Sequence, residues 1–453
     1  MRPDYLDTVG TQLAPGGLRR LIEKGAFFPD CRHLASTFTA SSLTTLATGA
    51  WPAQHGIVAD WRYDRAGHRP VKASEEALLA TTLAEQIDAD NHFRSWVVGM
   101  DESDTALFAG SAGSPVYWMD DEGLFATRGE KPDWLAVYNL QRNPESARNA
   151  KWQAVGAKPD APPLRVLNYA PEHPREFLAL YRSSPFAQNA QFDFASELIT
   201  REHIGQGNTT DVLFLLLGST ARLGYETGAR SPLMLQMILQ LDRRLEAFLA
   251  QLAKTPGENA FNLVLVGAHG APPEPPEYAR ARMAVNGESV AQTIDKILAA
   301  SGNGRVEKYL YPFLYLDTNG FRDPEPIRLA AGRAALQHPA VAGYFTAGGA
   351  ASTFNGWEQR FRNSFHQVRS GDVMLSYRAE YVEDISVARG VSYGSLYDYD
   401  ARVPLILYGP QFRAGVYESR VESVDVAPTL ARAMGVAPPS SAMGRVLGEA
   451  LVE

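Results

Sequence analysis

The chain has 453 residues, of which 45% are apolar and 21% are charged, and it carries a formal net charge of -8. A globular chain of this size buries a core without needing disulfides or metals to fold. The acidic balance and the lack of a long Lys/Arg run argue against nucleic acid as a partner. The single cysteine, Cys31, rules out a disulfide framework.

The sequence contains no apolar run of the roughly 18–20 residues that a membrane-spanning helix requires. The first ten residues, MRPDYLDTVG, have neither the basic nor the apolar region of a signal peptide. We therefore expect no transmembrane segment, and no signal peptide in the chain as given.

Apolar runs alternate with amphipathic segments along the chain. The amphipathic segments predict helices over residues 17–24, 75–88, 231–254 and 426–434. The apolar runs predict strands over residues 94–99, 212–218, 262–267 and 403–408. Continuous apolar strands are typical of sheets covered on both faces. The alternation predicts an α/β fold with a doubly wound, mostly parallel sheet and helices on both faces. Within it, residues 212–267 are expected to form one βαβ unit.

Two stretches lack this alternation and look like additions to the sheet. Residues 105–190 are rich in Pro, Gly, Trp and Tyr, and residues 271–375 begin with the proline-rich run APPEPPEY. We predict one domain over residues 1–453, with cap-like insertions at 105–190 and 271–375.

Residues 36–64 form the segment with the most chemical information. A cluster of Ser and Thr precedes a helical run over residues 41–48, Gly49 ends that run, and a tight turn follows at His55 and Gly56. A hydroxyl at a helix N-terminus is most often a cap. It can also be a nucleophile, because the helix end favours the negative charge of a phosphate.

This segment resembles the nucleophile region of the alkaline phosphatase superfamily. The resemblance is to its bacterial phosphate-monoesterase and type I phosphodiesterase–nucleotide pyrophosphatase branch. The matching residues are Thr37, Thr39, Ala40, Thr48, Gly49, Pro52, His55, Gly56 and Ile57. Further matches follow in the same order, at GST (218–220), AHG (268–270), YDYDARVPLILYGP (397–410) and VDVAPTLARAMG (424–435).

The resemblance implies a hydrolase in which two zinc ions flank a Thr or Ser nucleophile. Thr39 matches the nucleophile. Asp60 stands where the family has a substrate-contacting Asn, and Asp101 and Ser103 lie where the monoesterase branch has phosphate-binding Lys and Arg. We expect the two carboxylates to repel a phosphate, and by default Asp101 is read as part of a solvated loop.

The resemblance also locates the zinc ligands. Of the positions that match them, His269 is retained, whereas Ala221, Tyr225, Ala268 and Tyr393 replace an Asp or a His. A single His cannot hold zinc, so no cofactor is expected, and His269 is read as a vestigial ligand.

Two expectations concern what replaces or precedes these ligands. Tyr225 and Tyr393 are expected to fill the vacated space next to Thr39 and His269. The remaining ligand, an Asp on the first strand of the family, would lie before Met1, so the first strand is expected to be missing through a truncated start.

These substitutions lead to the hypothesis of a catalytically inactive protein that uses the inherited cleft for binding or scaffolding. The partner would be a small molecule, a glycan or a protein. One alternative is a metal-dependent phosphate mono- or diester hydrolase with a rearranged site and Thr39 as nucleophile. Another is metal-free hydrolysis of a different ester by Thr39 with His269 as base. By resemblance, and with a start further upstream, the compartment would be periplasmic or extracellular.

Overall fold

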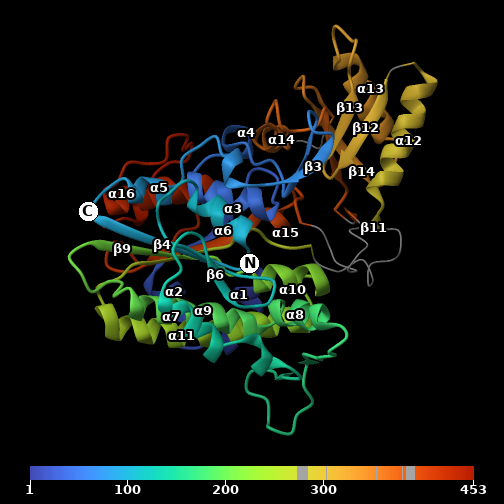
Figure 1. The fold of residues 1–453 in the computed structure, drawn as a ribbon. Helices are drawn as coiled ribbons and strands as arrows, with labels where there is room; N and C mark the ends of the chain where they lie inside the picture. Colours follow the sequence, from blue (N-terminus) through green and yellow to red (C-terminus); the bar gives the residue numbers. More distant parts are fainter. Residues whose placement is uncertain (273–283, 303, 353–355, 380, 384–392, 453) are drawn as a thin grey trace.

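The computed structural model describes residues 1–272, 284–302, 304–352, 356–379, 381–383 and 393–452. A large lobe is built around two sheets, and a smaller lobe with its own sheet lies to one side of it (Figure 1). In these ranges, no helix combines the length and the apolar content that a membrane crossing demands.

The two sheets of the large lobe have the strand orders β6-β5-β4-β9 and β10-β18-β1-β19, with β20 also paired to β1. The strands are β1 (Ala26–Arg32), β4 (Phe93–Gly99), β5 (Val116–Met119), β6 (Phe125–Thr127), β9 (Thr210–Leu215), β10 (Leu263–Val266), β18 (Arg402–Tyr408), β19 (Gly415–Val416) and β20 (Val421–Glu422). Strand β4 runs parallel to β5 and β9, whereas β18 runs antiparallel to β1 and β10. The α/β class is confirmed, with mixed strand directions because β18 opposes both of its neighbours.

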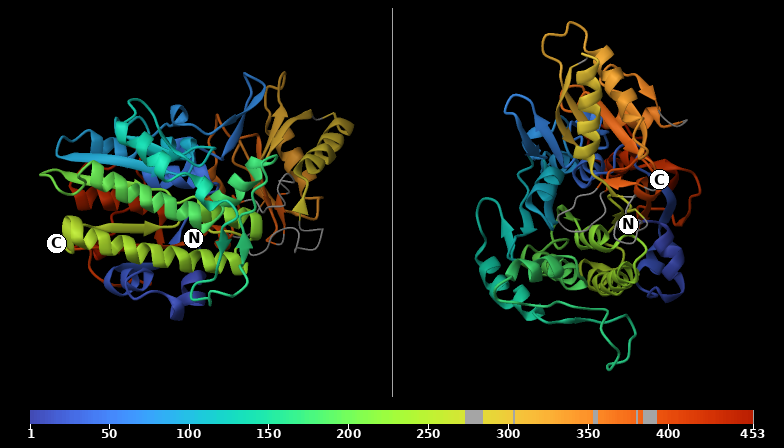
Figure 2. Two further views of the ribbon diagram at one scale, coloured as in Figure 1. Left: turned by 60° about the horizontal axis from the view of Figure 1, so that its bottom comes forward. Right: turned by 90° about the vertical axis from the view of Figure 1, so that its right-hand side faces the viewer.

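Helices cover both faces of these sheets (Figure 2). One face carries α1 (Asp4–Val9), α2 (Leu18–Lys24), α9 (Pro185–Arg201) and α11 (Pro232–Leu252). The other carries α3 (Thr39–Thr48), α5 (Leu83–Asp88), α6 (Glu102–Ala109) and α16 (Val426–Met434). Along β9, Leu213 and Leu215 pack with the first group, and Phe214 packs with the second. The predicted helices on both faces are therefore present.

Local capping explains where two of the predicted helices begin. Helix α11 starts after Ser231, whose hydroxyl accepts a hydrogen bond from the Met234 amide at 3.1 Å. The helix predicted over 75–88 begins only at Leu83. There, Thr82 and Glu85 cap each other's backbone amides and fix a new helix start.

Strands β9 and β10 differ from the prediction of fully buried strands. Their residues from Asp211 to Leu215 and from Leu263 to Val266 are only half-buried. Within the described residues, β9 pairs with β4 and β10 pairs with β18, so the two do not form one βαβ unit of a single sheet. A missing strand before Met1 stays a prediction.

The smaller lobe has the strand order β12-β13-β16-β14-β15. Its elements are α12 (Gly287–Ala300), β12 (Arg305–Leu310), β13 (Phe313–Asp317), α13 (Glu325–Ala335), β14 (Val341–Thr346), β15 (Ala351–Ser352), α14 (Glu358–Ser364) and β16 (Val373–Tyr377). A hairpin of β2 (Trp61–Asp64) and β3 (Arg69–Lys72) extends to this lobe, where the Tyr63 amide donates to the Tyr315 hydroxyl at 3.2 Å. Part of the predicted insertion 271–375 lies outside the described residues, and its insertion status stays a prediction.

The other predicted insertion, 105–190, divides into two parts. Residues up to Thr127 include β5 and β6, which belong to a sheet of the large lobe, and the cap-like insertion stays a prediction. The rest carries α7 (Asp133–Gln141), β7 (Lys151–Trp152), β8 (Arg165–Val166) and α8 (Pro174–Arg182). The remaining short elements are α4 (Pro52–His55), α10 (Ser219–Thr227), β11 (Ala284–Val285), β17 (Val382–Glu383) and α15 (Asp398–Ala401).

A buried carboxylate ties the first helices to α11. Asp242, whose side chain is 0% exposed, accepts hydrogen bonds from the amides of Ala14 at 2.5 Å and Leu18 at 2.7 Å. We expect Asp242→Ala to lower the free energy of unfolding by about 2–5 kcal/mol, because two buried amides lose their acceptor. Urea unfolding measures this, with Glu246→Ala as control, since Glu246 binds one partly buried amide, that of Gly16. Equal losses in the two variants would contradict this role of Asp242.

Candidate functional site

The candidate site lies where several strands end. Strands β1 and β10 both oppose β18, so they run parallel to each other and end at the same edge of their sheet. Thr39 follows β1 and His269 follows β10, whereas Asp101 and Ser219 follow β4 and β9, which are parallel to each other. The carboxyl ends of parallel strands are the usual place for ligand sites in α/β sheets.

Thr39 and His269 form a hydrogen bond at the centre of this edge. The distance between Thr39 Oγ1 and His269 Nε2 is 3.0 Å. The other ring nitrogen, Nδ1, lies 2.7 Å from the carbonyl oxygen of Gly270. Because a carbonyl only accepts, the hydrogen of the neutral ring belongs on Nδ1, and Nε2 is left to accept from the Thr39 hydroxyl.

Burial keeps the His269 ring uncharged. The residue is 5% exposed, and desolvation lowers the pKa of its imidazole to about 3. At pH 7 the ring is therefore neutral and has a lone pair for the Thr39 proton. The same burial makes the imidazole a weak base, since it disfavours the charged form that proton transfer would create.

Tyr225 and Tyr393 enclose this pair, as the sequence predicted. Desolvation raises the pKa of the Tyr225 hydroxyl, and the Thr39 side chain lies close enough to oppose that shift. The Tyr393 ring centroid lies 4.1 Å from that of Tyr225 and 4.2 Å from that of His269. The Tyr393 hydroxyl donates to the Ala221 carbonyl at 2.5 Å, so the two tyrosines are held against the threonine and the imidazole.

A glycine makes room for Tyr393. A Cβ at Gly224, on α10, would lie 2.2 Å from the Tyr393 hydroxyl. Ala221 is one turn before Tyr225 on the same helix, and Ala268 precedes His269. Both alanines are half-buried and offer no side-chain donor or acceptor to a metal or a substrate.

Asp60 is held at the N-terminus of α3. Its Oδ1 accepts from the Ala40 amide at 2.8 Å, next to the nucleophile position. Burial raises the pKa of the Asp60 carboxyl, whereas this hydrogen bond and the charge of Lys72 oppose the shift. A carboxyl oxygen therefore occupies a helix end that would otherwise attract an anion.

Asp101 differs from the solvated loop residue that the sequence suggested. Its carboxylate pairs with Arg182 at 2.9 Å and with Arg222 at 2.5 Å. Two guanidinium groups balance its charge, so the expected repulsion of a phosphate by Asp101 is weakened. Ser103 lies in the first turn of α6, and its buried hydroxyl has no hydrogen-bond partner among the described residues.

Asp104, Lys72 and Arg222 were missed by the sequence analysis. Desolvation, together with Asp101 and Asp60, raises the pKa of the Asp104 carboxyl to about 7, against the opposing charges of Lys72 and Arg222. Arg222 lies within the segment 219–225 that resembles the family, but at a position to which the resemblance gives no role, and Asp104 and Lys72 lie outside the matching motifs. Only the fold shows that a hairpin end and two helices bring them together.

The donors around Thr39 do not match a two-zinc site. In the part of the chain that the structure describes, no three or more His, Cys, Asp or Glu side chains are grouped so that they could hold a metal ion. The positions predicted to match the family's zinc ligands carry Ala221, Ala268 and the two enclosing tyrosines. Residues 390–392, which immediately precede Tyr393, lie outside the described residues.

Comparison with known proteins gives matches over the whole chain. Alkaline phosphatase PhoV of Synechococcus elongatus is 24% identical over 513 aligned residues, which cover 100% of this chain and 91% of PhoV. Alkaline phosphatase PafA of Elizabethkingia meningoseptica is 24% identical, covering 100% and 92%. The crystal structure of wild-type PafA superposes with a TM-score of 0.87 at 21% identity, covering 100% of this chain and 97% of that one. Murine ectonucleotide pyrophosphatase / phosphodiesterase 5 gives 0.60 at 15% identity, covering 97% and 93%.

These matches correct two of the sequence-based predictions. The hypothesis of an inactive binding or scaffolding protein is wrong, because relatives that match the full chain are named alkaline phosphatases. The expectation of no cofactor is contradicted as well, because alkaline phosphatases of this superfamily depend on zinc. Both predictions failed for the same reason. They rested on four positions that lack an Asp or a His, although four positions do not determine what a whole site can bind or catalyse.

The relationship to the family rests on more than single relatives. A sequence model described as "Type I phosphodiesterase / nucleotide pyrophosphatase" matches residues 1–374. This range includes Thr39, Asp60 and His269, and it extends through most of the smaller lobe. The chain therefore belongs to the type I phosphodiesterase / nucleotide pyrophosphatase family of the alkaline phosphatase superfamily.

Proposed function

We propose that this protein hydrolyses phosphoric esters, with Thr39 as the nucleophile and His269 as the group that takes its proton. The hydrogen bond of 3.0 Å between Thr39 Oγ1 and His269 Nε2 carries the proposal. A weak nucleophile is activated by an adjacent base that a third group orients. Here the Gly270 carbonyl holds the imidazole with Nε2 toward the hydroxyl. Membership of a hydrolase family supports the same reaction.

The first step would transfer the phosphoryl group to the protein. Thr39 Oγ1 forms a bond to phosphorus, its proton moves to His269 Nε2, and the ester bond between phosphorus and the leaving oxygen breaks. His269 then returns the proton to the leaving alcohol. This order leaves the imidazole neutral again, which its buried surroundings favour.

The second step would release the phosphate. A water molecule attacks phosphorus, gives its proton to His269 Nε2, and the bond between phosphorus and Thr39 Oγ1 breaks. The threonine regains its proton from the imidazole. Tyr225, whose pKa desolvation raises and the nearby Thr39 side chain partly lowers, would hold the threonine oxygen during both steps.

The ionisation of the carboxyls near Thr39 would determine how strongly a negatively charged substrate is repelled. Asp60 lies near enough to Asp104 to raise the pKa of the Asp104 carboxyl, and burial disfavours a charge on either residue. Protonated, they would donate to phosphoryl oxygens, and ionised they would repel them. Lys72 and Arg222 supply the opposing positive charge. Substrates with one negative charge, such as diesters, are repelled less than dianionic monoesters when these carboxyls ionise.

Removing the hydroxyl of Thr39 tests the nucleophile. We expect Thr39→Ala to lower kcat at least about 1,000-fold toward p-nitrophenyl phosphate and bis-p-nitrophenyl phosphate, whereas Thr39→Ser keeps measurable turnover through its hydroxyl. Both variants are assayed beside the unchanged protein, with and without added zinc. Intact-mass measurement of the unchanged protein during turnover checks for phosphothreonine. Undiminished activity in Thr39→Ala, or no turnover of either substrate by the unchanged protein, would contradict the proposal.

The ionisation of Asp104 predicts a pH dependence. Its pKa is raised to about 7, so the carboxyl is neutral below that pH and gains a negative charge as the pH rises through it. We expect KM for the monoester dianion to increase by about three- to tenfold across this range, and Asp104→Asn to remove the increase. The diester should show a smaller change. Glu102→Gln, on the same helical turn, is the control because its side chain is 52% exposed and pairs with Arg128. An unaltered pH profile in Asp104→Asn would show that this carboxyl does not act on the substrate.

A further inference from the structure

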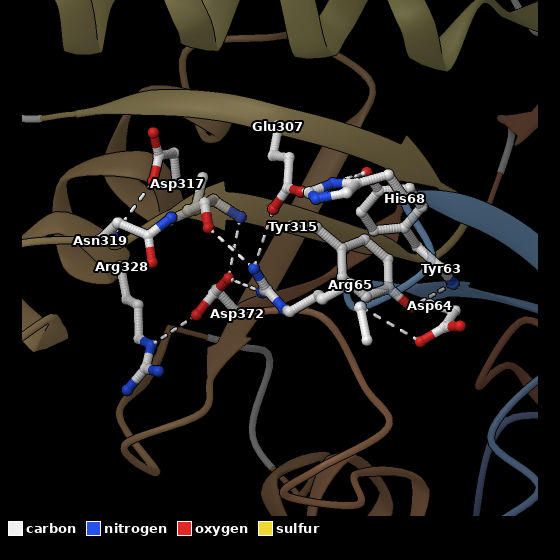
Figure 3. A network of polar contacts seen from close by, with 12 residues as sticks. Tyr63, Asp64, Arg65, His68, Glu307, Tyr315, Asp317, Asn319, Arg328 and Asp372 are labelled. Carbon is white, nitrogen blue, oxygen red and sulfur yellow. Dashed lines mark hydrogen bonds and ion pairs between the residues drawn. The ribbon is translucent and has the colours of Figure 1, made fainter.

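A cavity lies between the β2–β3 turn and the smaller lobe. It has a volume of about 430 Å³ and includes none of the residues of the Thr39 site. Figure 3 shows the polar network that forms much of its wall. The lining residues used below are Arg65, His68, Glu307, Thr318, Asn319, Arg328, Gln367 and Asp372.

Asp372 is the centre of that wall, and its acceptor capacity is already used. Its side chain is 4% exposed. One oxygen accepts from Arg328 Nε at 3.0 Å, and the other accepts from the Leu316 amide at 2.8 Å and from Arg65. Two guanidinium groups therefore hold this carboxylate from different sides, as Figure 3 shows.

Glu307, the other acidic residue of the wall, is also engaged. Its carboxylate accepts from the Tyr63 hydroxyl at 3.1 Å and from Arg65 Nη1 at 3.1 Å. His68 Nδ1 lies 3.4 Å from the same carboxylate. Both carboxylates of the cavity are thus occupied by donors of the protein itself, so neither is left to recognise a cationic ligand.

Donors remain unused on the same wall. Arg328 Nε donates to Asp372, and its Nη1 lies 3.5 Å from Glu325. The remaining nitrogen, Nη2, has no hydrogen bond to the described residues. The side chains of Thr318, Asn319 and Gln367 also have no hydrogen-bond partner in the described part of the chain, and all three line the cavity. A guanidinium can only donate, and an amide or a hydroxyl can donate too. The free capacity of the cavity therefore suits a ligand rich in acceptors.

We propose that this cavity is a second binding site, separate from the Thr39 site, for a small oxyanion such as a phosphate or a carboxylate. Arg328 is the anchor, because a fixed guanidinium fits the oxygens of such anions better than an ammonium group does. Its bond to Asp372 fixes the orientation of the guanidinium plane. The amides of Asn319 and Gln367 complete the donor set at the rim.

The site has a direct structural connection to the reaction centre. The hairpin that carries Arg65 and His68 begins immediately after Asp60 and ends at Lys72. The Ala73 amide donates to the Asp60 carbonyl at 2.9 Å and closes the base of the hairpin. An anion bound between the hairpin turn and α13 would hold the turn against the smaller lobe.

Calorimetric titration of the full chain at constant ionic strength tests the proposal, with inorganic phosphate in one arm and succinate in the other. We expect saturable binding of at least one anion, weakened about tenfold or more in Arg328→Gln. Arg333→Gln is the matched control, since Arg333 is exposed on the same helix and does not line the cavity. Hydrolysis of p-nitrophenyl phosphate should stay unchanged in Arg333→Gln. The arm that binds identifies phosphate or carboxylate as the ligand chemistry.

A second variant distinguishes loss of binding from misfolding of Arg328→Gln. Arg328→Gln also removes a partner of buried Asp372, whereas Gln367→Ala changes an exposed side chain and leaves the Asp372 contacts intact. We expect Gln367→Ala to weaken binding about three- to tenfold with an unchanged Tm. Wild-type affinity in both variants, or no binding in either arm by the unchanged protein, would overturn the proposal. Phosphate affinity lost only in Thr39-site variants such as Asp104→Asn would assign the binding to the reaction centre and would also overturn it.

Discussion

The hydrogen bond between Thr39 and His269 is the contact on which the candidate site depends. It joins the first residue of α3 to the residue that follows β10, and these two segments are 230 positions apart in the chain. The sheet makes the contact possible, since β1 and β10 flank β18 and end at the same edge. The imidazole keeps its orientation through the backbone carbonyl of Gly270, without a carboxylate partner. Its tautomer is therefore fixed by backbone geometry, whereas its basicity is limited by burial.

The charges around this contact give the site its chemical character. Asp60 caps the helix that begins at Thr39, and Asp104 stands close by with a pKa near neutrality. Two arginines neutralise the charge of Asp101. Its carboxylate therefore adds little negative potential to the site and mainly holds the two helices that carry the arginines. In the proposed reaction, the balance between ionised and protonated carboxyls would decide whether a phosphoryl group is repelled or bound. Among the described residues, no three or more His, Cys, Asp or Glu side chains are grouped so that they could hold a metal ion, so the ionisation of these carboxyls is the main charge variable that the side chains offer here.

Motif order was enough to predict the α/β class and the closeness of Thr39, His269, Tyr225 and Tyr393, whereas the role of Thr39 as nucleophile stays a prediction. These features follow from residues that the motifs place at strand ends. The opposed direction of β18 was not predictable, because a run such as VPLILY is apolar on both faces whichever way it runs. The late start of α5 depends on a reciprocal cap between Thr82 and Glu85, which the periodicity of residues 75–88 hid.

Charge partners were the least predictable part of the site. Asp101 looked like a solvated residue because Arg182 and Arg222 reach it from helices 81 and 121 positions away. Function was misjudged for a related reason. Ligand positions were read one at a time, although catalytic competence belongs to the whole arrangement of groups around the reacting atom.

The one-sided pairing of β9 and β10 has a consequence for local motion. In a sheet, a strand with a single neighbour uses only alternate backbone amides in its ladder. Within the described residues, β9 and β10 each have one such neighbour and half-buried side chains. Amide hydrogens that point away from β4 and β18 are thus open to exchange with solvent deuterons, in alternation with protected ones. His269 lies three residues after the end of β10, so its imidazole stands beyond a strand whose backbone amides are open to exchange on one side.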